Sequence, residues 1–141
     1  MENTIKVDIV SAEADIWSGV AKMLFAPAAM GEIGVAPRHA PLLTRLKAGE
    51  VRVQQESGEE LYFYVSGGII EVQPYLVTIL ADTASRAKDL DEAAALEAKQ
   101  RAEAALADKS DAIDYAKAQA ELIEAVARLQ MIENLRKRAK R

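Results

Sequence analysis

The chain changes its side-chain pattern between Asp82 and Asp89, and this change limits the folds it can adopt. Before Asp82, short runs of β-branched and aromatic residues are broken by Gly, Pro and Ser at close intervals. After Asp89 the sequence is mostly alanine and charged residues. The first pattern is typical of strands and the second of helices. The sequence therefore predicts an α+β protein with its strands and helices in separate parts of the chain.

The N-terminal part predicts an all-β sandwich or flattened barrel of roughly eight to ten strands. Apolar and polar residues alternate over 5–9, 51–53 and 61–65, so each of these strands should have one buried face. Residues 55–59 have the composition of a hairpin turn, and 66–68 hold two adjacent glycines that suit a positive φ or a bulge.

An antiparallel two-helix hairpin is predicted to follow, which places the domains at 1–86 and 87–141. The first helix should span about 90–107. Asp89 and Glu92 have the spacing of an acidic capping box, because both carboxylates would lie at the positive end of the helix dipole.

The first helix presents small residues to its neighbours. Its predicted inner stripe consists of Ala94, Ala98, Ala102 and Ala105, with Ala95 and Leu106 at the margin. At about 0.8 kcal/mol per buried methyl group, such a stripe contributes around 3 kcal/mol. Because alanine has the highest helix propensity, we expect this helix to detach without melting.

A polar break at 108–111 precedes the second helix, which Ser110 or Asp111 can cap. Apolar residues cover more than half of its circumference. One stripe holds Ile113, Ala116, Ala120, Ile123 and Ala127, and another holds Tyr115, Leu122, Val126 and Leu129. Beyond Gln130 the apolar side changes again, to Met131, Ile132, Leu135 and Ala139. The pattern predicts a second partner surface, with fraying of the last turns as an alternative for the end of the helix.

Composition and motifs argue against several kinds of function. The net charge of -4 does not favour nucleic acid as the main ligand, and the absence of cysteine excludes disulfides and thiolate metal sites. We find no secretory signal pattern, no metal-ligand spacing and no glycine-rich phosphate loop. His39 is the single histidine and lies between prolines, so a structural or interface role is expected. The sequence predicts no catalytic residue, metal or cofactor.

Two polar features remain open to more than one interpretation. Tyr62 and Tyr64 flank Phe63 and should lie opposite the core face, either in a contact surface or in solvent. The tail at 136–141 carries a cluster of positive charge. This tail is either a solvated end or a ligand for an acidic protein surface.

Several short motifs, taken in order, resemble the epsilon subunit of bacterial F-type ATP synthases. They are VSAE at 10–13, SG at 18–19, GEIGV at 31–35, PRHAPLL at 37–43, SGGIIEV at 66–72 and LADTA at 80–84. The resemblance covers nearly the whole chain, because a helical hairpin follows the motifs in both.

The resemblance implies a non-catalytic rotor subunit of a proton-translocating ATP synthase. Its sandwich of about ten strands would join the gamma subunit to the ring of c subunits during ATP synthesis, with Glu32 and His39 near the rotor contacts. The hairpin would extend along gamma into the head formed by the alpha and beta subunits and inhibit ATP hydrolysis. Such a subunit is peripheral, on the cytoplasmic face of the bacterial inner membrane, and meets the membrane only through the complex.

The resemblance also implies residues for the inhibitory contacts of the second helix. These are Leu122, Val126, Arg128, Leu129, Ile132 and Arg136. By this likeness, Arg128 and Arg136 would meet acidic segments of the beta subunits.

A departure from the family concerns nucleotide binding at the start of the first helix. Some members bind ATP through a motif that here corresponds to Leu90, Asp91 and Ala95, but the arginine position holds Ala94. Without a guanidinium to engage phosphate, we expect weak or absent ATP binding.

An alternative from another class is a sugar- or peptide-binding sandwich with a helical dimerisation arm. Only Trp17 and four tyrosines are available for a stacking surface, which does not favour it.

Overall fold

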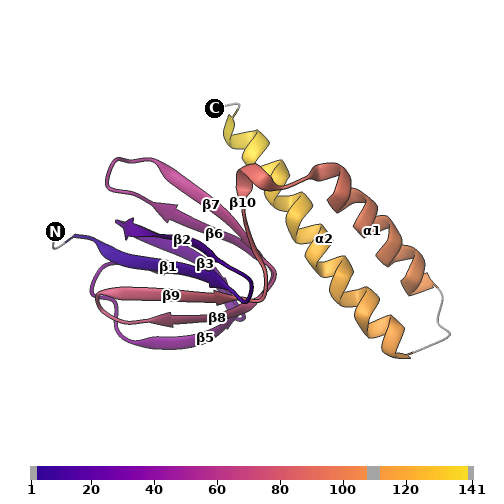
Figure 1. Cartoon of the computed structure of the whole chain (residues 1–141), viewed down its shortest axis with the longest axis horizontal. Helices are drawn as coiled ribbons and strands as arrows, with labels where there is room; N and C mark the ends of the chain where they lie inside the picture. Colours follow the sequence, from indigo (N-terminus) through magenta and orange to yellow (C-terminus); the bar gives the residue numbers. More distant parts are fainter. Residues whose placement is uncertain (1–2, 108–111, 140–141) are drawn as a thin grey trace. The chain divides into compact units, whose positions relative to one another are not determined.

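The computed structural model describes residues 3–107 and 112–139, with the side chains of 3–107 and 115–139. The chain divides into two compact units, Met1–Lys88 and Asp89–Arg141. The first unit contains the strands and the second the helices, as the change in sequence pattern predicts (Figure 1).

The first unit is a sandwich of ten strands that is nearly closed into a barrel. The strands are β1 Ile5–Ser11, β2 Asp15–Ala21, β3 Met23–Ala28, β4 Gly31–Val35, β5 Leu42–Leu46, β6 Gly49–Gln54, β7 Glu60–Val65, β8 Gly68–Val72, β9 Leu76–Ala81 and β10 Ala84–Arg86. Their hydrogen-bonded order is β10-β7-β6-β3-β5-β8-β9-β1-β2, with β4 paired to β3. Neighbouring strands are antiparallel except β1 and β9.

The alternating residues of the predicted strands form the core of the sandwich. Ile5, Val7 and Ile9 are buried from β1, and the same alternation buries Val51 and Val53 from β6. In β7 the residues Phe63 and Val65 are buried, while Leu61 packs partly buried against them. Because every second side chain of a strand points to the same face, the sequence alternation is enough to define this core.

The predicted turns are confirmed. Residues 55–59 connect β6 to β7, with the amide of Gln55 donating to the carbonyl of Glu59 at 2.9 Å. Gly67 and Gly68 both have positive φ, at 137° and 135°. A Cβ on Gly68 would overlap the carbonyl oxygen of Leu80 on β9, so glycine is required there for close strand contact as well as for its φ.

The second unit contains helices α1 Glu92–Ala107 and α2 Ala112–Ala139, preceded by a short 3-10 helix at Ala87–Asp89. The predicted capping box is wrong. Asp89 ends the 3-10 helix, and Asp91 caps α1, because its carboxylate accepts a hydrogen bond from the amide of Ala94 at 3.2 Å. The predicted caps of α2, Ser110 and Asp111, lie outside the described residues.

The predicted inner stripe of α1 is partly wrong, because the buried face lies toward its predicted margin. Ala95 and Ala102 are buried, whereas Ala94 and Ala105 are exposed. Ala98 is half-buried, as is Leu106 at the margin. One residue changes the direction of a side chain by about 100°, so a small error in phase exchanges inner and outer alanines.

In α2 the buried residues Ala118 and Ala125 belong to neither predicted stripe. Leu122 and Leu129 of the second stripe lie beside them and are half-buried. Most of the described first stripe is on the outside: Ala116, Ala120 and Ile123 are exposed, and Ala127 is half-buried. Ile113 lies outside the residues whose side chains are described. We call Ala116, Ala120 and Ile123 the exposed apolar stripe of α2.

The end of α2 is ordered as helix up to Ala139, so the fraying alternative is wrong for the described turns. Met131 is buried, and Ile132 and Leu135 are half-buried. The change of apolar side predicted after Gln130 is therefore accompanied by burial of these residues.

Candidate functional surfaces

Surfaces, rather than an enclosed site, hold the candidate functional residues of this chain. In the described part of the chain no polar or charged side chain is buried. Three or more His, Cys, Asp or Glu side chains do not come together there in a metal-binding group.

Glu32 and His39 lie toward different ends of β4, because Glu32 is the second residue of this strand and His39 comes four positions after its last residue, Val35. Glu32 is exposed near the start of β4, opposite Pro27 of β3. It follows a tight turn in which Met30 is 98% exposed. His39 follows the other end of this strand.

His39 is held in a turn built by its neighbours. The amide of His39 donates to the carbonyl of Ala36 at 3.2 Å, with Pro37 and Arg38 between them. Arg38 has a φ of 63°, the left-handed value that the third position of a type II turn requires. The amide of Arg38 donates to Pro74 at 2.8 Å, which ties this loop to the turn between β8 and β9. The loop therefore presents His39 from a fixed backbone.

Sequence reasoning missed an apolar surface on the outer side of the sandwich. Ile69 of β8 and Leu80 of β9 are paired across the strands and both are exposed. Val10 of β1 pairs with Leu80 on its other side, and Leu43 of β5 is 69% exposed beside Glu71, the next outward residue of β8. We call Leu43, Ile69 and Leu80 the outer apolar patch. Consecutive apolar residues such as Ile69 and Ile70 were the available signal, because only one of them can face the core.

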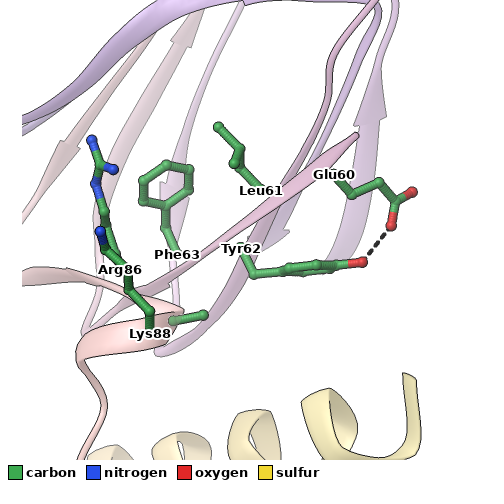
Figure 2. A pocket seen from close by; sticks show the side chains of 7 residues that line it. Glu60, Leu61, Tyr62, Phe63, Arg86 and Lys88 are labelled. Atoms are coloured by element: carbon green, nitrogen blue, oxygen red, sulfur yellow. Dashed lines mark hydrogen bonds between the residues drawn. The ribbon is translucent and has the colours of Figure 1, made fainter. Parts of the chain in front are cut away.

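A pocket of about 290 Å³ lies where β10 leaves β7 (Figure 2). Its lining comprises Glu60, Leu61, Tyr62, Phe63, Arg86, Ala87 and Lys88. Inside it the hydroxyl of Tyr62 donates to a carboxylate oxygen of Glu60 at 2.5 Å. Tyr64 is buried, so the solvated interpretation is wrong for this residue, whereas Tyr62 is half-buried.

The residues of the predicted nucleotide motif have structural roles in the helical unit. Asp91 caps α1 and Ala95 is buried, while Leu90 is half-buried just before the helix. A groove of about 410 Å³ between α1 and α2 is lined by Ala94, Ala98, Arg101, Glu121, Glu124 and Arg128. Ala94 contributes only a methyl group to it.

The predicted regulatory residues of α2 do not form one face. Leu122, Leu129 and Ile132 are half-buried, whereas Val126 is exposed. The guanidinium groups are engaged within the helical unit. Arg128 lies 3.7 Å from a carboxylate oxygen of Glu124 in the same helix. Arg136 forms an ion pair with Glu92 at the start of α1.

Comparison with known proteins gives matches over both units. The family model of the β-sandwich domain of the ATP synthase delta/epsilon chain matches residues 4–87, and that of its long α-helix domain matches 88–133. An ATP synthase epsilon chain of Alkalilimnicola ehrlichii is 68% identical over 139 residues, which cover 99% of each chain.

Two solved structures share the fold. A chain in the cryo-EM structure of Euglena gracilis mitochondrial ATP synthase, with OSCP, F1 and c-ring, matches with a TM-score of 0.81 and 20% identity, over 91% of this chain and 80% of that one. A chain in the central stalk and c-ring structure of Tetrahymena thermophila mitochondrial ATP synthase matches with a TM-score of 0.58 and 12% identity, over 91% of this chain and 96% of that one.

Proposed function

Because this chain belongs to the ATP synthase epsilon chains, non-catalytic central-stalk subunits of F-type ATP synthase, we propose that it couples the gamma subunit to the c-ring and inhibits ATP hydrolysis through its helices. In this proposal residues 1–86 bind the rotor and residues 87–141 regulate the catalytic head. The sugar- or peptide-binding module is set aside, since both family models belong to the ATP synthase chain.

Rotor binding by the sandwich is supported by its exposed apolar residues. Gamma and the c-ring would contact the outer apolar patch and the loops that carry Glu32 and His39. Leu43, Ile69 and Leu80 are exposed on three neighbouring strands, and a group of exposed apolar side chains is typical of a protein contact surface. Exposed apolar area of this kind gains free energy when a partner covers it.

Replacing Ile69 by Asp tests this surface. The charge would have to be desolvated on binding, so ATP-driven proton pumping by the assembled complex should fall while ATP hydrolysis is retained. Glu71→Asp, which preserves the charge on the same strand, is the control. Undiminished proton pumping in the Ile69→Asp complex would contradict rotor binding through this patch.

The exposed apolar stripe of α2 is the observation that best supports regulation. In the hairpin, α2 buries Ala118 and Ala125 but leaves Ala116, Ala120 and Ile123 in solvent. A helix with a second apolar face is suited to a second partner. We propose that this face, with Val126 beside it, binds gamma and the alpha and beta subunits when the hairpin extends. Leu122, Leu129 and Ile132 lie on the other side of α2 and would form a second contact face once they leave α1. Arg128 and Arg136 would meet acidic segments of beta.

Deleting the chain after Leu106 tests inhibition. The rate of ATP hydrolysis by the assembled complex should rise, because α2 can no longer enter the head. A narrower test is Ile123→Gln, which makes the exposed stripe polar, with Glu121→Gln as a matched control outside it. Hydrolysis that stays unchanged after deletion would refute the inhibitory role.

The proposal places the chain at the cytoplasmic face of the bacterial inner membrane, as a peripheral subunit held there by the c-ring. The described helices include none that is long and apolar enough to cross a membrane. Binding through protein partners is consistent with the net charge of -4, which gives nucleic acid little to contact.

A further inference from the structure

The ion pair between Glu92 and Arg136 joins the beginning of α1 to the end of α2. Glu92 is the first residue of α1, and Arg136 lies in the last turn of α2. The two guanidinium nitrogens face the two carboxylate oxygens, with Nη1 donating to Oε1 at 3.1 Å and Nη2 donating to Oε2. Such a two-point contact is the strongest arrangement that these side chains can form.

This pair depends on the hairpin being closed, unlike three other ion pairs of the same unit. Those three join residues four positions apart within one helix, and they are Lys99–Glu103, Arg128–Glu124 and Lys137–Glu133. Each can persist when the helices separate. The Glu92–Arg136 pair spans 44 positions and must break.

The location favours a contact that can be exchanged rather than a permanent one. The side chains of Arg136 and Glu92 are 61% and 46% exposed, so water and salt reach the pair. The fully buried contacts between the helices are alanines, namely Ala95, Ala102, Ala118 and Ala125, and the larger Leu122 and Leu129 are only half-buried. Because small groups contribute little on burial, a modest polar contact can change the balance between closed and open hairpins.

We propose that Glu92 is an internal competitor for Arg136, closing the hairpin and withholding this guanidinium from an acidic partner. When the hairpin opens, Arg136 exchanges the carboxylate of Glu92 for a carboxylate of the partner protein. The inference rests on the proposed function, in which the hairpin extends and its arginines meet acidic segments. It adds a specific contact that opposes that extension.

A double-mutant cycle in the full chain tests this Glu92–Arg136 contact, which we call the latch. Spin labels on Glu97→Cys and Gln130→Cys report the distance between α1 and α2, and the chain has no native cysteine to interfere. Glu92→Gln and Arg136→Gln should each raise the ratio of open to closed hairpins about two- to fivefold at low salt, the range for an exposed ion pair. The double variant should open no further than either single variant, because the same contact is lost in all three.

Lys137→Gln is the matched control, because it removes one positive charge from the same helical turn but belongs to the Glu133 pair. It should leave the ratio unchanged. The latch is overturned if Lys137→Gln opens the hairpin as much as Arg136→Gln. It is equally overturned if the effects of Glu92→Gln and Arg136→Gln multiply in the double variant.

Failure of the latch and failure of the proposed function give different results. The cycle measures hairpin opening in the isolated chain, whereas deletion after Leu106 measures ATP hydrolysis in the complex. If the deletion raises hydrolysis but the cycle shows no coupling, only the latch is wrong. If both hold, Glu92→Gln should also lower hydrolysis in the complex, since it releases α2 toward the head.

Discussion

The sandwich and the helical unit differ in the size of the side chains they bury. The sandwich buries Phe63, Ile5, Ile9, Leu24 and Ile70 almost completely. In the described helices the buried residues are alanines and Met131. Large apolar side chains each contribute about 1.5–3 kcal/mol on burial, whereas a methyl group contributes about 0.8 kcal/mol. The sandwich is therefore held together by large buried side chains, whereas most of the fully buried residues of the helical unit contribute a single methyl group each.

The largest effect is expected for Phe63→Ala. Removing this ring from the core should lower the free energy of unfolding of the sandwich by about 3–5 kcal/mol. Urea unfolding followed by the fluorescence of Trp17, whose ring centre is 5.9 Å from that of Phe63, would measure it. Leu43→Ala, on the exposed patch, should change the value by less than about 0.5 kcal/mol. If Phe63→Ala and Leu43→Ala lowered the free energy of unfolding equally, the large buried side chains would not dominate the stability of the sandwich.

Gly68→Ala should have an intermediate effect on the same unit. An added Cβ would overlap the backbone of β9, and the φ of 135° is unfavourable for alanine. The free energy of unfolding of the sandwich should therefore fall by about 1–3 kcal/mol. Gly58→Ala is the control, because Gly58 also has a positive φ but nothing lies within 4 Å of its added Cβ. Comparing the thermal unfolding of the two variants separates the cost of the positive φ from the cost of the overlap with β9. A Gly58 variant as unstable as the Gly68 variant would show that overlap contributes nothing.

In the helical unit, loss of the N-terminal cap of α1 should have a smaller effect on stability. Asp91→Ala should destabilise α1 by about 1 kcal/mol, because the amide of Ala94 loses its hydrogen bond. Asp89→Ala should have almost no effect, since Asp89 ends the preceding 3-10 helix. Circular dichroism of the full chain on heating would measure both. The reverse order of the two variants would restore the capping box that the spacing of Asp89 and Glu92 indicates.

The smallest expected effect is that of ATP on the isolated chain. Ala94 provides no guanidinium for phosphate, Asp91 is occupied in capping and Ala95 is buried. Isothermal titration calorimetry should therefore detect no micromolar binding. Micromolar affinity would contradict the expected absence of ATP binding, and the groove between α1 and α2 would then be a candidate nucleotide site.

Sequence reasoning predicted the sandwich accurately because its signals are local. Alternation placed Val51, Val53 and Phe63 in the core, and the adjacent glycines marked the tight approach at Gly68. It missed the outward positions of Ile69 and Leu80, since an apolar residue on the outer face breaks the rule that defines the inner one. Pairing across β8 and β9 was needed to show that these residues form one patch.

For the helices, the sequence correctly indicated their presence but only part of the buried face of α1 and not that of α2. Alanine is found on several sides of both helices, so burying Ala94 or Ala95 differs little in transfer free energy. The partner helix selects the face, which is why Ala118 and Ala125 are buried and Ile123 is not.

The amino-acid sequence by itself determined where strands end and helices begin, which residues fill the sandwich and which family the motifs resemble. These properties depend on residue type and on spacing over a few positions. Only the tertiary structure decided that Asp91 caps α1, that α2 keeps an apolar stripe exposed, and that Arg136 meets Glu92. Those outcomes depend on how two helices pack, and partners 44 positions apart leave no periodic signal in the chain.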